Sequence, residues 1–225
     1  VDREKAPAEI LSTLMPQAIG MRDILDLLPL GLNDRLDGTS PTFAELRKII
    51  IEDEPALRLA ALGVPTGRSP LGALGDLHVA GPPCTDFSLL GRRAGTAGVT
   101  MRAFLTWVRL LLVTLPAIIV FENVLGFPLE MLGELTHGRY ILDAVILNPA
   151  DLGWPVRRVR RYAVLRRRGH SCNWRPLSDL KALFSLQRSL PGRVLYSSGS
   201  GRDSEALGAG YQQRLGGYSA MNGST

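Results

Sequence analysis

Short apolar runs alternate with amphipathic segments through the middle of this chain. The apolar runs, each with the length of a buried strand, are residues 76–80, 117–121, 144–147 and 162–165. Apolar residues recur at helical spacing within 100–113, and a second, shorter helix is expected at 129–135. Strands that alternate with helices in this way predict an α/β, doubly wound (Rossmann-like) core with a parallel sheet and helices on both faces. In such sheets the working groups gather beyond the carboxyl ends of the strands.

The ends of the chain carry weaker patterns. Ser40 followed by Pro41 is typical of a helix start, and apolar spacing extends this helix to about Glu54. Residues 63–75 are rich in glycine and proline and are expected to form a loop. We therefore expect three regions: a poorly defined helical region at 1–70, a catalytic core at 71–170, and a partial or poorly ordered extension at 171–225.

Composition limits the class of protein. The chain has 225 residues, is 45% apolar, and contains no uninterrupted apolar run of the roughly 18–20 residues that a membrane span needs. Its N-terminus shows no secretory pattern. The two cysteines, Cys84 and Cys172, cannot build a disulfide framework and lack metal-ligand spacing. We therefore expect a protein that has no membrane anchor and binds no metal. We also expect it to work in a reducing compartment, which would be the nucleus in a eukaryote and otherwise the cytoplasm.

Positive charge is concentrated in one segment. The net charge is +5, and between residues 152 and 178 there are eight arginines and no acidic residue. These arginines are Arg157, Arg158, Arg160, Arg161, Arg166, Arg167, Arg168 and Arg175. Such a cluster is either a surface that faces phosphates or a solvated face that confers solubility.

Three polar groups follow successive strands in a specific order. Cys84 lies in a Pro-Pro-Cys turn after the first strand, Glu122 opens a Glu-Asn-Val run after the second, and Arg158-x-Arg160 follows a Gly-Trp-Pro turn. In this order they resemble motifs IV, VI and VIII of the cytosine carbon-5 methyltransferases. The resemblance covers residues 76–165.

Smaller features agree with this resemblance. Phe-Ser follows Cys84 after two residues, and residues 121–126 read Phe-Glu-Asn-Val-x-Gly, close to the family form. Residues 147–155 match the approach to the arginine motif. The glycine-rich loop 91–98 resembles the catalytic lid that closes over the extruded base in this family.

The resemblance implies a role for each of these residues. The Cys84 thiolate would attack carbon 6 of a flipped cytosine, making carbon 5 nucleophilic. Arg158 and Arg160, or the helix after the loop, could supply the positive field that the thiolate needs. Glu122 would hold the base at N3 and its exocyclic amine, while Arg158 and Arg160 on one strand face would bind the base oxygen and either a phosphate or Glu122. The implied methyl donor is S-adenosylmethionine, with the Pro83 backbone lining its site.

The sequence also departs from the family pattern. Val156 stands where the arginine motif normally opens with glutamine. Nothing in residues 1–75 matches the family's Phe-x-Gly-x-Gly donor-binding turn, motifs IX and X do not appear, and residues 166–225 are short for a target-recognition domain. Since the chain also begins at Val1 without methionine, we expect it to be a fragment.

Three hypotheses follow. The first is a DNA (cytosine-5-)-methyltransferase that uses S-adenosylmethionine, and the second is a transfer-RNA methyltransferase of the same family. The arginine-rich segment cannot separate these, because DNA and RNA both present phosphates. The third is a degenerate module that binds nucleic acid without activity. The expected partner is thus DNA, with RNA possible, and no membrane.

Overall fold

The chain divides into two compact units. The computed structural model describes residues 23–62, 75–89, 91–170 and 175–179. The first unit comprises Val1–Leu147 and Val159–Leu183, and the second comprises Asn148–Arg158 and Phe184–Thr225. Among the described residues, the first unit contains all the strands, and the second contains the 3₁₀ turn η5 (Pro149–Leu152).

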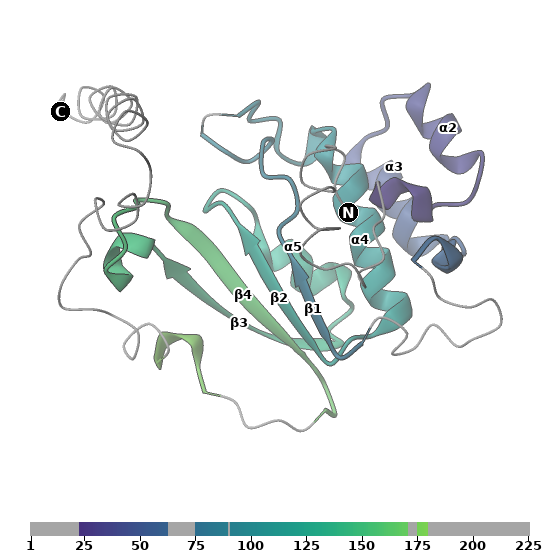
Figure 1. Cartoon of the computed structure of the whole chain (residues 1–225). Helices are drawn as coiled ribbons and strands as arrows, with labels where there is room; N and C mark the ends of the chain where they lie inside the picture. Colours follow the sequence, from purple (N-terminus) through teal and green to yellow (C-terminus); the bar gives the residue numbers. More distant parts are fainter. Residues whose placement is uncertain (1–22, 63–74, 90, 171–174, 180–225) are drawn as a thin grey trace, which may run out of the picture. The chain divides into compact units, whose positions relative to one another are not determined.

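A four-stranded sheet forms the centre of the first unit (Figure 1). Its strands are β1 (Leu77–Ala80), β2 (Ile118–Asn123), β3 (Tyr140–Leu147) and β4 (Arg160–Arg167), in the spatial order β1-β2-β4-β3. β1 pairs with β2 in parallel, whereas β4 is antiparallel to both β2 and β3. The alternation of strands and helices confirms the expected α/β class.

Two expectations about the sheet need correction. The sheet is mixed rather than wholly parallel, because β4 is antiparallel and lies between β2 and β3. Apolar runs predict that a strand exists, but not its direction. In addition, β2 extends two residues beyond the predicted strand, so Glu122 lies within the strand and not directly after it.

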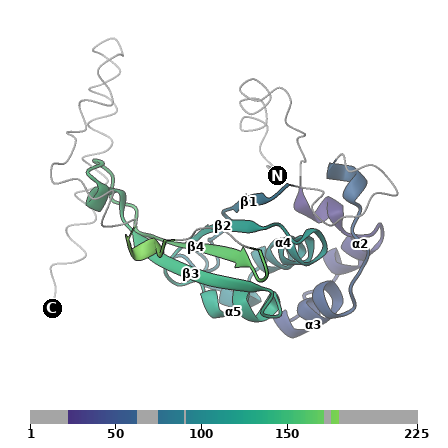
Figure 2. The ribbon, with the colours of Figure 1, turned by 90° about the horizontal axis from the view of Figure 1, so that it is seen from below.

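One face of the sheet carries the hydrophobic core. Helices α4 (Thr100–Thr114) and α5 (Leu129–Leu135) lie on this face (Figures 1 and 2). In β2 the side chains of Ile119 and Phe121 are buried on it, whereas the alternate residues are only partly buried. Helices were expected on both faces. In the part of the chain that the structure describes, α4 and α5 lie on the same face. Leu77 and Val79 of β1 belong to the other face and remain 59% and 68% exposed.

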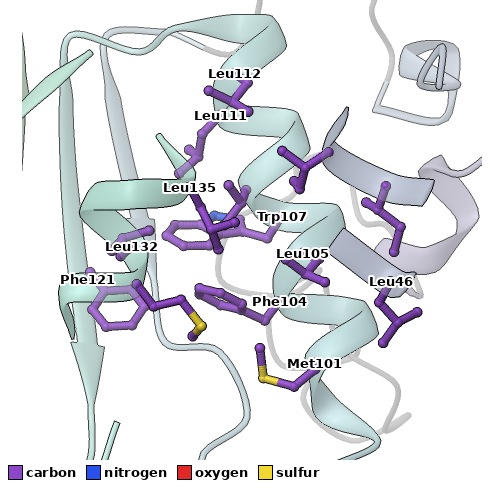
Figure 3. Close-up of a cluster of buried hydrophobic side chains, with 14 of the residues drawn as sticks. Leu46, Met101, Phe104, Leu105, Trp107, Leu111, Leu112, Phe121, Leu132 and Leu135 are labelled. Carbon is purple, nitrogen blue, oxygen red and sulfur yellow. The ribbon is translucent and has the colours of Figure 1, made fainter. Parts of the chain in front are cut away.

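The core is built around aromatic rings (Figure 3). Phe121 of β2 stacks with Trp107 of α4 at a centroid distance of 5.7 Å, and Leu132 and Leu135 of α5 close the same cluster. The α4 side chains Met101, Phe104, Trp107, Leu105, Leu111 and Leu112 all contribute. The helical spacing in the sequence therefore predicted the buried face of α4 correctly, with its end one residue further on.

The N-terminal elements pack against α4. They are η1 (Ile24–Leu27), α2 (Leu32–Asp37), α3 (Phe43–Arg47), the π-helical turn η2 (Lys48–Glu52) and η3 (Leu59–Leu62). The predicted start of α3 was two residues early, since Thr42 is the N-cap and forms a capping box with Glu45. Arg102 of α4 donates to the Leu36 carbonyl (2.6 Å) and pairs with Asp37, which attaches α2 to α4.

Some expectations fall outside the described residues. They concern the loop at 63–74, the role of Cys172 and most of the C-terminal extension. Within the described residues, no helix has both the length and the apolar character to cross a membrane.

Candidate active site

Cys84 lies in a tight turn after the carboxyl end of β1. The Cys84 carbonyl accepts hydrogen bonds from the amides of Phe87 (3.0 Å) and Ser88 (2.9 Å), which closes the turn. The Cys84 side chain is half-buried, and Pro83 before it is exposed. We call residues 82–88 the cysteine turn. Its position beyond a strand end leaves the thiol accessible without placing it on a free surface.

The end of β2 and the segment between β2 and α5 support one side of the cysteine turn. The Asn123 amide Nδ2 donates to the Pro82 carbonyl (3.4 Å). Gly126 lies so close to the turn that an added Cβ would be 2.6 Å from the Phe87 carbonyl oxygen. The Phe87 and Phe127 rings meet edge to face at 5.0 Å. The residues that follow Glu122 thus serve partly to hold the turn that carries Cys84.

The start of α4 supports the other side. The Asp86 carboxylate accepts hydrogen bonds through Oδ2 from the Thr100 amide (3.0 Å) and the Thr100 hydroxyl (2.6 Å). Thr100 is the first residue of α4, so the carboxylate lies at the positive end of the helix dipole. Asp86 is 1% exposed. The sequence did not single out Asp86 or Thr100.

The glycine-rich loop 91–98 is bonded to the cysteine turn. The Arg92 amide donates to the Thr85 carbonyl (2.9 Å), and the Gly95 amide donates to the Asp86 carbonyl (2.8 Å). An added Cβ on Gly91 would lie 1.8 Å from the Thr85 carbonyl oxygen. The glycines therefore allow close approach to the backbone of the cysteine turn. Whether this loop closes as a lid stays a prediction.

Glu122 and Arg160 meet at the same end of the sheet. Arg160 Nε lies 2.9 Å from Glu122 Oε1, and the two side chains are 17% and 31% exposed. The pairing is possible because β4 is antiparallel and begins where β2 ends. Gly81, three residues before Cys84, would place a Cβ 3.3 Å from Glu122 Oε2. The carboxylate thus lies against the strand end that leads into the cysteine turn.

Arg158 belongs to the second unit and lies before β4 begins. Its side chain is exposed, and its amide donates to Asn148 Oδ1 (3.1 Å). The same Asn148 oxygen accepts from the Ala150 amide at the start of η5. The expectation that Arg158 and Arg160 share one face of a strand is therefore wrong, because only Arg160 is in the strand.

Several cluster arginines have structural partners. Three donate to backbone carbonyls distant in sequence: Arg161 to Phe127 (3.2 Å), Arg167 to Leu115 (2.5 Å) and Arg168 to Gly138 (2.7 Å). Strand register places Arg161 and Arg167 on the face of the core, opposite to Arg160 and Arg166. The eight arginines therefore do not form one phosphate-facing surface.

Two of the three expected sources of positive field, Arg160 and the N-terminus of α4, have carboxylate partners. Arg160 pairs with Glu122, and the N-terminus of α4 binds Asp86. In the described part of the chain no group of three or more His, Cys, Asp or Glu side chains is arranged to hold a metal ion. The arrangement offers a nucleophilic thiol, a carboxylate and its guanidinium partner at one sheet edge, which suits covalent attack followed by proton transfer.

Sequence reasoning missed the residues that hold the cysteine turn in place. Asp86 lies between Cys84 and the Phe-Ser pair that follows it. Its signal in the sequence is a carboxylate followed by a glycine-rich loop and a helix start that lacks its own capping side chain. Gly126 had a weaker signal as the glycine that ends the Glu-Asn-Val run. No local pattern indicated that Asn123 would bond to Pro82, since the two residues come together only through strand pairing.

Comparison with known proteins gives a consistent result. The family model described as C-5 cytosine-specific DNA methylase matches residues 73–187, which is about half of the chain. The type II methyltransferase M.AquIA of Picosynechococcus sp. is 31% identical over an alignment of 112 residues, and the match covers 42% of this chain and 44% of that protein. The chain thus spans less than half the length of this curated relative.

Comparison with solved structures concerns the fold. The structure of the Entamoeba histolytica methyltransferase EhMeth superposes with a TM-score of 0.50 at 14% identity, covering 84% of this chain and 48% of that one. The S. pombe Dnmt2 methyltransferase matches with a TM-score of 0.40 at 25% identity, covering 52% of this chain and 38% of that one. The EhMeth match supports a partial Rossmann-like methyltransferase core.

Proposed function

This chain belongs to the C-5 cytosine-specific DNA methylase family, and we propose that it carries the catalytic centre of a DNA (cytosine-5-)-methyltransferase. The observation that carries the proposal is the placement of Cys84 and the Glu122–Arg160 pair at one end of the sheet. Family membership implies a nucleic-acid substrate and a methyl donor of the S-adenosylmethionine type.

The proposed chemistry begins with Cys84. Its thiolate adds to carbon 6 of a cytosine extruded from the duplex, and the ring electrons move toward carbon 5. The half-buried turn fits this role, because a thiol at the rim of the sheet can meet a base that enters from solvent. After carbon 5 has gained its new substituent, loss of the carbon-5 proton expels the thiolate and restores the aromatic ring.

Glu122 is the proposed contact to the base. A carboxyl group can bind N3 and the exocyclic amine together, and can share a proton with N3 as negative charge develops there. Arg160 orients this carboxyl through its 2.9 Å contact to Oε1. The Oε2 atom, on the side of Gly81, lies toward the strand end that precedes Cys84.

The proposed methyl donor is of the S-adenosylmethionine type. S-adenosylmethionine would supply an electrophilic methyl group to carbon 5. Pro83 is exposed beside Cys84, which is compatible with a backbone contact to this donor. Residues 1–75 hold no match to the family's glycine turn. A calorimetric titration of S-adenosylmethionine therefore tests directly whether this chain binds the donor.

A donor-independent reaction tests the nucleophile. When the thiolate adds to carbon 6, carbon 5 can take a proton from water and then lose its original hydrogen as the thiolate departs. We therefore expect the protein to release tritium from random-sequence duplex DNA labelled at carbon 5 of cytosine. Cys84→Ser should abolish this release and leave DNA binding largely intact, because serine cannot form a comparably strong nucleophile near neutral pH.

The outcomes discriminate between the three hypotheses. Release from labelled transfer RNA but not from DNA would replace DNA with RNA as the substrate. Nucleic-acid binding without release from either substrate would favour the degenerate module. Persistence of release in Cys84→Ser would show that Cys84 is not the nucleophile. A Cys172→Ser variant provides the matched control, since it removes the other cysteine and should keep full release.

A further inference from the structure

We propose that Asp86 is a positioning residue for Cys84, acting through its bond to the start of α4. The inference rests on the proposed function, because it assigns Asp86 a part in the same reaction. Asp86 lies two residues after Cys84 and is 1% exposed, although a carboxylate is among the groups that are rarely buried without a specific partner. A buried charge in the turn that carries the proposed nucleophile needs a physical reason.

The hydrogen bonds of Asp86 supply that reason. Oδ2 accepts from both the amide and the hydroxyl of Thr100, at 3.0 and 2.6 Å. Hydrogen bonds to a charged acceptor are stronger than neutral ones, and the helix N-terminus adds favourable electrostatics. The backbone carbonyl of Asp86 also accepts from the Gly95 amide, so one residue bonds to two separate segments.

Packing around Asp86 leaves no room for a side chain at position 98. An added Cβ on Gly98 would lie 2.0 Å from the Asp86 carboxyl carbon. Gly98 is itself buried, and Met101 just beyond it is fully buried in the core. The absence of a side chain at position 98 thus lets the helix start approach the carboxylate.

The cysteine turn is consequently held from two sides. Asn123 at the end of β2 supports it together with Gly126 and Phe127 just after β2, and Asp86 attaches it to α4. Because α4 is anchored in the core by its whole buried face, the Asp86–Thr100 bond transmits that rigidity to Cys84. A nucleophile must lie within a fraction of an ångström of its attack geometry for full rate.

The test compares single-turnover tritium release from duplex DNA labelled at carbon 5 of cytosine, at saturating protein, for variants on either side of this bond. Asp86→Ala removes the acceptor, and we expect the release rate to fall about 10- to 100-fold, the range expected for misplacement of a reacting group. The DNA concentration at half-saturation of binding should change less than about twofold, since DNA does not contact the buried carboxylate. Asp86→Asn keeps an oxygen that can accept from Thr100 and should recover part of the rate.

Further variants keep the proposal falsifiable if Asp86→Ala does not fold. Thr100→Val removes only the hydroxyl donor and should lower the release rate in the same direction by a smaller factor. Glu134→Gln removes an exposed carboxylate of α5 and should change nothing. The alkylation rate of Cys84, followed by peptide mass spectrometry, gives a second readout that needs no nucleic acid, and we expect it to change in Asp86→Ala and Thr100→Val.

Three results would overturn the inference. They are wild-type release rates in folded Asp86→Asn and Thr100→Val, a loss confined to DNA binding, and a loss that follows melting temperature equally in all variants. Failure of the proposed function is distinguishable, because it would appear as no tritium release from the unmodified protein. The alkylation measurement would then still report whether Asp86 controls the environment of Cys84.

Discussion

At the scale of single residues, Glu122 depends on a neighbour that is distant in sequence. Its carboxylate is partly buried and pairs with Arg160, which lies 38 positions later in the chain. A carboxylate with one oxygen bound by a guanidinium keeps a fixed orientation, and its other oxygen remains available to a substrate. The sequence predicted both residues, but the contact between them exists only because β4 returns antiparallel beside β2.

This pair leads to a prediction for the carboxylate. Glu122→Gln preserves the shape of the side chain but removes its charge and its ability to share a proton with the base. We expect tritium release from labelled DNA to fall by about 10²- to 10⁴-fold, the usual contribution of a general acid–base group. Glu134→Gln is the matched control, and an unchanged rate in Glu122→Gln would remove Glu122 from the catalytic assignment.

At the scale of elements, glycines decide how closely two segments approach. Gly126 lies between β2 and α5, and an added Cβ would meet the Phe87 carbonyl oxygen at 2.6 Å. Gly133 lies within α5, and an added Cβ there would meet nothing within 4 Å. An alanine substitution at these two glycines should therefore have opposite effects on stability.

We therefore predict opposite signs for two alanine variants. Gly126→Ala should destabilise the fold by about 1–3 kcal/mol, since the methyl group overpacks against backbone. Gly133→Ala should stabilise it by about 0.5–1 kcal/mol, since alanine has the better helix propensity. Denaturant unfolding of both variants measures the difference, and equal effects on the free energy of unfolding would contradict the close approach at Gly126.

Tyr140, the first residue of β3, joins that strand to the segment before β2. Its hydroxyl donates to the Pro116 carbonyl (3.2 Å), and burial raises the pKa of Tyr140 to about 12. The neutral phenol is therefore favoured in the folded state. Its contribution to stability is fully present below pH 10, the ordinary tyrosine value, and is lost as pH rises through about 12.

This pKa shift gives a pH-dependent prediction. The free energy of unfolding should fall more steeply between pH 10 and about 12 in the unmodified protein than in Tyr140→Phe. Ultraviolet absorbance should show one phenol that ionises late and is missing from the variant. If the phenol that is missing from the variant ionises near pH 10, the ordinary tyrosine value, Tyr140 is exposed to solvent and the prediction is wrong.

At the scale of the whole molecule, stability of the first unit depends on one aromatic cluster. Phe121 is fully buried and contacts the rings of Trp107 at 5.7 Å and Phe127 at 5.2 Å. These three rings come from α4, β2 and the segment before α5, so they join the elements that support the cysteine turn. Loss of this packing should affect the site and the fold together.

The cluster predicts a large effect of truncation at its centre. Phe121→Ala should lower the free energy of unfolding by about 3–5 kcal/mol, the usual cost of removing a buried aromatic ring. Leu30→Ala serves as the control, because Leu30 is 81% exposed and its loss should change stability little. Thermal or denaturant unfolding measures both, and a small effect at Phe121 would contradict the packing of α4 on the sheet.

Local patterns carried much of the information about the elements. The spacing predicted α5 with its observed bounds and α4 to within one residue, because an amphipathic stripe forms wherever a helix must bury one face. The positions of Cys84 and Glu122 at the ends of two apolar strands also predicted that they would lie at one sheet edge. Their proposed chemical roles remain predictions.

Other features could be decided only by the tertiary structure. The antiparallel direction of β4, the pairing of Arg160 with Glu122, and the use of Arg161 and Arg167 as donors to backbone carbonyls all depend on contacts between distant segments. The sequence by itself determined which groups are available: a thiol, a carboxylate and guanidinium groups after apolar strands. Strand pairing then determined which of them meet, because hydrogen bonds and ion pairs act only over a few ångströms, whatever the distance along the chain.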